Sequence, residues 1–198
     1  MSNSFKTIIV DPQDHLTWIT LNRPEVSNAF NTQMAEELLE VFSDFVSGAR
    51  QARCIILTGS GDRAFCAGGD LKQRHGMSDD EWYAQHVVFE EVARALIDCP
   101  TPLLGAINGA AFGGGVELTL ACDFAYAASH ARFALTETTL GIMPGMVGTQ
   151  YLPLAVGIRR AKEIILTGKP FTAEQALQWG LINQICEPDE LIKTVRSV

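Results

Sequence analysis

The sequence has few of the features that mark secreted or metal-binding proteins. Its five cysteines are scattered and odd in number, and none forms a C-x-x-C pair or a zinc-ligand spacing with the four histidines. A disulfide framework is therefore excluded, and the thiols are typical of buried, reduced cysteines in a reducing compartment. No metal site is expected. The cysteines are Cys54, Cys66, Cys99, Cys122 and Cys186.

Long hydrophobic runs and targeting segments are also missing. No uninterrupted apolar stretch is long enough to span a bilayer. The first six residues, MSNSFK, contain neither the apolar core of a signal peptide nor the arginine-rich pattern of a transit peptide. We therefore expect a cytoplasmic protein that does not associate with membranes.

Positive charge is scarce. Lys and Arg number 15 against 23 Asp and Glu, which gives a formal net charge of -8. Because neutralising nucleic-acid phosphates requires clustered Lys and Arg, this balance excludes a general nucleic-acid binder. It is compatible with a small anionic ligand, since a few local cations suffice to bind one.

The apolar residues are sufficient for one folded domain over residues 1–198. They make up 47% of the chain, and there is no repeat, low-complexity segment or linker. Segments with strand character alternate with segments of helical periodicity, which predicts an α/β fold. The predicted strands cover residues 7–10, 16–21, 54–58, 103–107, 124–127, 132–135 and 181–186. The predicted helices begin near Asn31 and Asp79 and cover 114–121, 159–166, 173–179 and 189–195.

Two glycine-rich turns carry most of the functional information. The first is AFCAGGDLK at residues 64–72, and the second is NGAAFGGGVEL at residues 108–118. Glycine lets backbone N–H groups face a ligand without an intervening Cβ. Two such turns can supply two donors to a developing negative oxygen, as in acyl-transfer enzymes. The structural alternative is that the first turn only connects a strand to a helix and the second only allows close helix packing.

Two glutamates accompany these turns. Glu117 lies in the first turn of a very apolar predicted helix, so burial is expected to raise its pKa towards neutrality. An acid at a helix N-terminus can also be purely structural, because it interacts favourably with the helix dipole. Glu137 follows 20 positions later (137 − 117), so only tertiary folding could bring the two carboxylates together.

A third glycine pattern suggests a different class of protein. Residues 59–64, GSGDRA, follow a predicted strand and match the loose dinucleotide pattern G-x-G-x-x-G/A. That motif should open directly into a helix whose N-terminus holds the pyrophosphate. Adjacent glycines follow here instead and are poor helix formers, so a surface turn is favoured over an NAD-binding oxidoreductase.

At these residues the chain resembles the enoyl-CoA hydratase (crotonase) superfamily over nearly its whole length. Within that superfamily the string from Phe65 to Arg74 is most similar to enoyl-CoA and methylglutaconyl-CoA hydratases. The resemblance implies an α/β spiral of ββα units with a thioester site between the two glycine turns. It is carried by residues 21–24 with 28–29, 64–72, 108–123, 137–150, and 166–168 with 173–176.

The resemblance also implies roles for individual residues. The backbone N–H groups of Gly69 and Gly114 would form an oxyanion hole, and Glu117 and Glu137 would be the two catalytic acids. Arg23, Lys72 and Arg74 are candidates for contacts to the 3′-phosphate of coenzyme A. Substrate or coenzyme A contacts are further implied for Val26, Ser27, Ala29, Ala67, Gly68, Asp70, Leu71, Gly113 and Met146.

The implied activity is that of a lyase in fatty acid metabolism. An enoyl-CoA hydratase adds water across the α,β double bond of an acyl-CoA thioester, and coenzyme A enters only as part of the substrate. Two alternatives remain open at this point. One is a single-glutamate isomerase or other thioester enzyme of the same superfamily, and the other is a non-catalytic acyl-CoA-binding remnant.

Two departures from the family pattern affect these expectations. The stretch after Gly145 reads MVGTQY where relatives commonly have GGGTQR, so bulkier residues flank the expected acyl pocket. Relatives also continue through further C-terminal helices, which cover the pocket and build a trimer. That region is expected to be largely absent here. A homo-trimer or hexamer is accordingly expected only if such helices exist.

Overall fold

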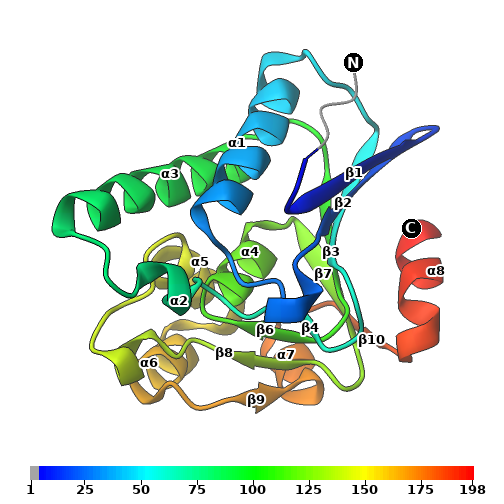
Figure 1. Ribbon diagram of the computed structural model, residues 1–198. Helices are drawn as coiled ribbons and strands as arrows, with labels where there is room; N and C mark the ends of the chain where they lie inside the picture. Colours follow the sequence, from blue (N-terminus) through cyan, green and yellow to red (C-terminus); the bar gives the residue numbers. More distant parts are fainter. Residues whose placement is uncertain (1–4) are drawn as a thin grey trace.

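Successive turns of the chain each add one strand to a large sheet and one strand to a small sheet. This computed structural model describes residues 5–198, so residues 1–4 of the amino-terminal prediction lie outside it. In the large sheet the strand order is β1-β2-β3-β5-β7-β10, and in the small sheet it is β4-β6-β8-β9 (Figure 1). Between β3 and β8 the strands alternate between the two sheets, with β3, β5 and β7 in the large one and β4, β6 and β8 in the small one, as the expected spiral of ββα units requires.

The large sheet is parallel except for its first hairpin. There β1 and β2 pair antiparallel, with Ile8 opposite Leu21. The small sheet is parallel between β4, β6 and β8, and β9 pairs antiparallel with β8. The large-sheet strands are β1 (Ile8–Gln13), β2 (Leu16–Leu21), β3 (Cys54–Gly59), β5 (Leu103–Ile107), β7 (Phe124–Ala128) and β10 (Gln184–Cys186). The small-sheet strands are β4 (Ala64–Cys66), β6 (Ala110–Phe112), β8 (Arg132–Ala134) and β9 (Phe171–Thr172).

Helices follow most of these strand pairs, and side chains fix several helix starts. Asn31 accepts a hydrogen bond from the Met34 N–H, and Ser78 and Thr172 form capping boxes. The α-helices are α1 (Thr32–Ser47), α2 (Leu71–Arg74), α3 (Asp79–Ile97), α4 (Gly114–Ala121), α5 (Gly148–Val156), α6 (Ile158–Thr167), α7 (Ala173–Trp179) and α8 (Leu191–Arg196). Short 3-10 helices are η1 (Pro24–Val26), η2 (Glu137–Leu140) and η3 (Pro188–Glu190).

Both faces of the large sheet are covered. Alternate residues of β3 enter different cores: Ile55 and Leu57 join the main core with α1 and α3, whereas Ile56 joins a smaller cluster with Leu191 and Val195 of α8. Figure 1 shows α8 on the far side of the large sheet from α1 and α3. A strand buried on both faces reads as a continuous apolar run, as residues 54–58 do.

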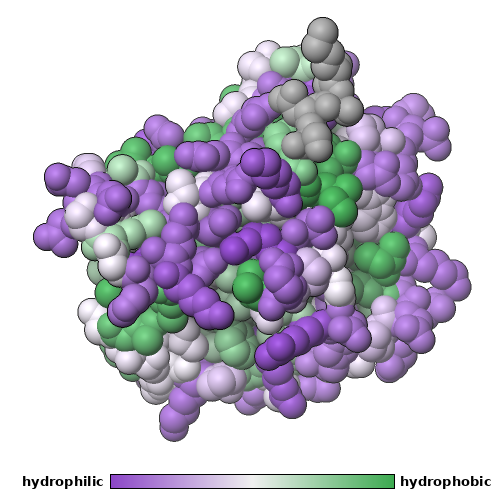
Figure 2. Space-filling model, viewed as in Figure 1, coloured by the Kyte–Doolittle hydropathy of each residue, from purple (hydrophilic) through white to green (hydrophobic). Residues whose placement is uncertain are grey.

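The outer surface carries both hydrophilic and hydrophobic side chains. On the face shown in Figure 2, hydrophilic side chains predominate and hydrophobic patches lie scattered between them. Among the residues that the structure describes, none of the helices combines the length and apolar character needed to cross a bilayer.

The dinucleotide pattern at residues 59–64 is a close strand-to-strand turn. After Gly59 the chain enters β4 rather than a helix, so the pattern lacks a helix N-terminus for a pyrophosphate. A Cβ on Gly59 would lie 2.6 Å from the carbonyl oxygen of Phe65, which explains the glycine by packing. The surface-turn interpretation therefore fits this segment better than the nucleotide-binding one.

The longer sequence-based elements agree with the structure, except that the strand predicted at 7–10 continues to Gln13 as β1. The strand predicted at 181–186 is restricted to Gln184–Cys186, and the helix predicted at 189–195 divides into η3 and α8. The three-residue strands β4 and β6 were not predicted, because three residues are too few to show a periodicity. These two strands hold the glycine turns side by side.

Candidate active site

A cavity of about 570 Å³ opens between the two glycine turns. The first turn, the second turn, helix α3, η2 and the segment before α5 all contribute to its wall. Glu117 and Glu137 both line it, together with apolar side chains such as Phe30, Phe89 and Met146. Two carboxylates that are far apart in the sequence thus share one largely apolar pocket.

The two glycine turns touch each other at the mouth of this cavity. Gly68 has a φ of +89°, and a Cβ there would lie 2.7 Å from the carbonyl oxygen of Phe112 and 3.4 Å from the Gly114 nitrogen. Only glycine allows both this backbone conformation and this approach. The register follows from β4 and β6, which are neighbours in the small sheet.

Two backbone N–H groups remain available where the turns meet. Phe30 donates its N–H to Gly68 O and accepts from Asp70 N, so the intervening N–H of Gly69 faces away from Phe30. Gly114 is the first residue of α4, where an N–H has no intrahelical acceptor. Within the described part of the chain, neither N–H donates a loop or cap hydrogen bond.

Backbone N–H groups at and before the start of α5 donate hydrogen bonds to Glu117. The carboxylate oxygen Oε1 accepts hydrogen bonds from the N–H of Met146 at 2.8 Å and from the N–H of Gly148 at 2.9 Å. The side chain is 3% exposed. Burial raises the pKa of Glu117, and the backbone donors and the nearby His86 oppose that rise.

Glu137 has a much poorer hydrogen-bonding environment. Among the described residues, no group bonds to its buried oxygen Oε2. Burial raises the pKa of Glu137 to about 7, a shift that its own backbone N–H opposes and the charge of Glu117 increases. The other oxygen, Oε1, lies 3.0 Å from the position that a Cβ on Gly113 would occupy. A carboxyl group in this setting exchanges its proton near neutral pH.

Helix α3 supplies a third wall of the cavity. Trp82 stacks on His86 with ring centroids 5.1 Å apart, and His86 Nε2 lies 3.3 Å from a carboxylate oxygen of Glu90. His86 also packs against Gly145, where a Cβ would meet its ring at 2.9 Å. The helix therefore supports the segment that positions Glu117.

The sequence matches the enoyl-CoA hydratase/isomerase family over residues 11–198. The chain belongs to this family. The short-chain-enoyl-CoA hydratase of Clostridium acetobutylicum is 35% identical over 191 residues, which cover 96% of this chain and 73% of the relative. The crotonyl-CoA hydratase of Syntrophomonas wolfei is 35% identical over 195 residues, with coverages of 98% and 75%.

A solved structure has the same fold. The crystal structure of an enoyl-CoA hydratase from Bacillus anthracis superposes with a TM-score of 0.93 at 40% identity. The match covers 97% of this chain and 74% of that one. Membership of the enoyl-CoA hydratase/isomerase family and the crotonase-type spiral are thereby confirmed together.

Most residues that the family resemblance assigns to the site do line the cavity. Glu117, Glu137, Gly69 and Gly114 all contribute to its wall. So do the proposed substrate contacts Ala67, Gly68, Leu71, Gly113 and Met146.

The remaining assigned residues lie beside the cavity rather than in its wall. Ser27 is next to the first glycine turn, since its carbonyl oxygen accepts from the Ala67 N–H. Val26 ends η1, and Ala29 accepts a hydrogen bond from the Arg23 guanidinium. The proposed coenzyme A contacts of Val26, Ser27 and Ala29 remain predictions.

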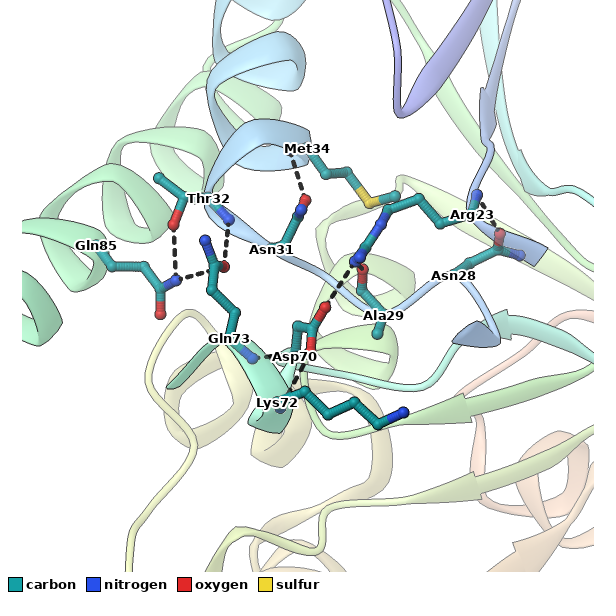
Figure 3. Close-up of polar contacts among 10 residues, drawn as sticks. All are labelled: Arg23, Asn28, Ala29, Asn31, Thr32, Met34, Asp70, Lys72, Gln73 and Gln85. Atoms are coloured by element: carbon teal, nitrogen blue, oxygen red, sulfur yellow. Dashed lines mark hydrogen bonds and ion pairs between the residues drawn. The ribbon is translucent and has the colours of Figure 1, made fainter. Parts of the chain in front are cut away.

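Asp70 forms hydrogen bonds and an ion pair within the protein itself (Figure 3). Its carboxylate accepts from the N–H groups of Lys72 and Gln73 at the start of α2, and pairs with Arg23 at 2.9 Å. Burial opposes ionisation of Asp70, but these partners outweigh it and lower the pKa of the carboxyl group. Its side chain is thus already occupied, and a substrate contact of Asp70 remains a prediction.

The sequence did not predict that α3 contributes to the cavity. Trp82, His86 and Phe89 all line the cavity. They recur at i, i+4 and i+7, which places them on one face of a helix. That spacing is the signal that could have found them, but the helix was predicted from its apolar residues alone, Val87, Val88, Val92, Leu96 and Ile97.

Proposed function

We propose that the protein is an enoyl-CoA hydratase that adds water syn across the α,β double bond of an acyl-CoA thioester. One observation carries the proposal: two carboxylates with contrasting hydrogen bonding face one cavity beside two available backbone N–H groups. Relatives named short-chain-enoyl-CoA hydratase and crotonyl-CoA hydratase support it. Acyl-CoA is the proposed partner, and a cytoplasmic location is proposed with it.

The N–H groups of Gly69 and Gly114 would bind the thioester carbonyl oxygen. Attack of water on the β-carbon moves negative charge onto that oxygen, so donors fixed in advance stabilise the transition state more than the ground state. Each such donor typically contributes on the order of 3 kcal/mol. Gly114 adds the positive end of the α4 helix dipole.

Glu117 would act as the base. Its Oε1 is fixed by the N–H groups of Met146 and Gly148, which favour the carboxylate form and leave Oε2 free to accept a proton from water. The oxygen of that water then bonds to the β-carbon of the substrate. The anchoring geometry suits a residue that must aim a water molecule at one carbon.

Glu137 would act as the acid. Its pKa of about 7 keeps a proton on a large fraction of the molecules near neutrality. That proton would pass to the α-carbon as the enolate collapses, which completes the addition of water. One proton passes from water to Glu117 and another from Glu137 to the α-carbon, while the water oxygen bonds to the β-carbon. Because the net reaction adds only water, it needs no redox cofactor, and coenzyme A enters only with the substrate.

The test compares Glu117→Gln and Glu137→Gln with the wild type on crotonyl-CoA, followed by loss of the enoyl-thioester absorbance. Each variant should lose about 10²–10⁴-fold in kcat, because each removes one proton-transfer role while keeping the side-chain shape. Glu163→Gln on the exposed face of α6 is the matched control and should keep wild-type activity.

Hydration at the wild-type rate by either active-site variant would overturn the two-carboxylate scheme. A parallel assay with a 3-enoyl-CoA identifies the main competing activity. If isomerisation persists in one variant while hydration is lost in both, the protein is a single-glutamate isomerase. No turnover of either substrate by the wild type would indicate a non-catalytic acyl-CoA binder.

A further inference from the structure

His86 is held on α3 by partners one helical turn away on either side. Its ring stacks on Trp82 with the two planes 10° apart, and its Nε2 lies 3.3 Å from the carboxylate oxygen Oε1 of Glu90. The other oxygen of Glu90 pairs with Arg94 at 3.6 Å, so the carboxylate is itself fixed. Residues four apart on a helix are neighbours on its surface, and these contacts therefore set the position of the imidazole in the cavity wall.

The imidazole also packs against the segment that binds Glu117. A Cβ on Gly145 would lie 2.9 Å from the ring carbon Cε1 and 3.5 Å from Nδ1, so the backbone of Gly145 approaches the ring closely. The next residue, Met146, donates its N–H to Glu117 Oε1, and Gly148 donates a second N–H to the same oxygen. A movement of the ring is therefore passed to the donors of Glu117 through a single peptide unit.

The charged groups around His86 come from four elements. Glu90 lies on the same helix, Glu117 on α4, Glu137 in η2 and Arg74 at the end of α2, and all four line the cavity with His86. Arg74 carries its charge at every pH at which the protein is folded, so its effect on the carboxylates is constant. His86 differs from it, because a histidine gains its positive charge as the pH falls through the neutral range.

The positive form of His86 favours the ionised form of Glu117. Burial raises the pKa of Glu117, and the backbone donors and the charge of His86 oppose that rise. Burial also raises the pKa of Glu137, to about 7. The proposed base is ionised and the proposed acid is protonated only at pH values between these two pKa values. His86 therefore extends this range on its acidic side.

We propose that His86 is a positioning residue for Glu117: its ring supports the backbone that binds the carboxylate, and its imidazolium form keeps that carboxylate ionised. The inference rests on the proposed hydratase function, because it gives His86 a role towards the base of that reaction. The role requires no contact between His86 and the substrate. Its consequence is that hydration continues to a lower pH than it would without the histidine.

The experiment measures the pH dependence of crotonyl-CoA hydration in wild type, His86→Phe and His86→Ala. Phenylalanine keeps an aromatic ring beside Trp82 and Gly145 but carries no charge. On the acidic limb, kcat/KM of His86→Phe should fall about 3- to 10-fold below the wild type, and the alkaline limb set by Glu137 should stay in place. His86→Ala should also lower the maximum, because Gly145 loses its neighbour. An unchanged acidic limb in His86→Phe or an unchanged maximum in His86→Ala overturns the proposal.

His15→Phe is the matched control for the loss of a histidine. His15 is exposed in the turn between β1 and β2 and does not belong to the cavity wall. The same replacement there should leave both limbs and the maximum at their wild-type values. A loss on the acidic limb equal to that of His86→Phe would show that the effect does not depend on the position of His86, and the proposal fails.

A double-mutant cycle tests the contact between His86 and Gly145. The methyl group of Gly145→Ala would lie 2.9 Å from the ring, and its displacement of the ring or the backbone should lower the maximal kcat about tenfold. In the His86→Ala background the methyl group has room, and the same replacement should cost less than about threefold. Equal losses in the two backgrounds would show that the contact does not affect Glu117, which overturns the supporting role.

A titration without substrate separates this inference from the proposed function. Carbon-13 NMR of protein labelled at the glutamate carboxyl carbons follows Glu117 directly, and the absence of one signal in Glu117→Gln identifies it. The titration midpoint of Glu117 should move to higher pH in His86→Phe. That movement supports the role of the charge even if crotonyl-CoA is not hydrated. A midpoint that does not move excludes that role even if hydration is observed.

Discussion

Glu117 and Glu137 line one cavity, but their carboxyl oxygens have different surroundings. Two backbone N–H groups bond to one oxygen of Glu117, whereas a buried oxygen of Glu137 has no hydrogen-bond partner among the described residues. Burial raises the pKa of both groups, and that of Glu137 reaches about 7. Backbone donors oppose the rise at Glu117, whereas the buried oxygen of Glu137 lacks such a partner. This contrast in hydrogen bonding is the basis for the opposite roles proposed for two side chains of identical chemistry.

Among changes that keep both glutamates, the largest expected effect comes from crowding Glu137. In Gly113→Ala the new Cβ would lie 3.0 Å from Glu137 Oε1, at a residue with a φ of +51°. Displacement of Glu137 should reduce kcat about 10²-fold, because proton transfer is sensitive to shifts of roughly 1 Å. The measurement is crotonyl-CoA hydration.

Gly48→Ala is the matched control for backbone strain. Gly48 has a φ of +78° at the end of α1, and no atom lies within 4 Å of its Cβ position. Strain alone should lower the free energy of unfolding by about 1–3 kcal/mol in both variants. An activity loss in Gly48→Ala equal to that in Gly113→Ala would show that strain, not contact with Glu137, is responsible.

A medium effect should appear when each acid is replaced by leucine. Near pH 4.5, the ordinary value for glutamate, Glu137 is largely protonated in the folded protein, and burial raises the pKa of Glu117 as well. Glu117→Leu then leaves the N–H groups of Met146 and Gly148 without an acceptor and should cost about 1–3 kcal/mol of unfolding free energy. Glu137→Leu should change little at this pH. Urea unfolding measures both.

The stability of Glu137→Leu relative to the wild type should increase as pH rises. The folded pKa of Glu137 is about 7 and its unfolded value is near 4.5, so the unfolded chain releases this proton first. Wild-type stability is therefore lost progressively between these two values, and Glu137→Leu removes that loss. The variant should be more stable than the wild type at about pH 8. A stability difference independent of pH would contradict the raised pKa.

The smallest effect concerns a third carboxylate, Asp70, whose oxygens are fully engaged in structure. Asp70→Ala removes the cap of α2 and the ion pair with Arg23, and should cost about 1 kcal/mol of unfolding free energy. The KM for crotonyl-CoA should stay within about threefold of the wild type, because no reacting group is lost. A large rise in KM with unchanged stability would instead support a direct contact with coenzyme A.

The sequence was sufficient to predict the longer helices and strands and the burial of Glu117. Strand β5 and helix α4 have the predicted bounds, since a buried five-residue run and a glycine-led apolar helix are strong local signals. The burial of Glu117 followed from its apolar neighbours on α4. The proximity of Glu117 and Glu137 came from the family resemblance, because their 20-residue separation has no local consequence.

Other parts of the site had no sequence signal of comparable strength. Strands β4 and β6 are short, and the donors to Glu117 are backbone N–H groups of Met146 and Gly148, which any residue except proline could supply. Arg74 was considered only as a coenzyme contact. Its position in the cavity depends on the long-range bond to Gln85, which a local pattern does not reveal.

The direct pairing of β4 with β6 limits how far apart the two glycine turns can be. Gly69 and Gly114 follow the ends of these adjacent strands, which lie at the usual interstrand spacing of about 4.8 Å. Two nitrogens at that spacing, each about 2.9 Å from one oxygen, would subtend roughly 110° at it, close to the directions of its lone pairs. The strand pairing, rather than the side chains of the two turns, would then set the dimensions of the proposed oxyanion hole.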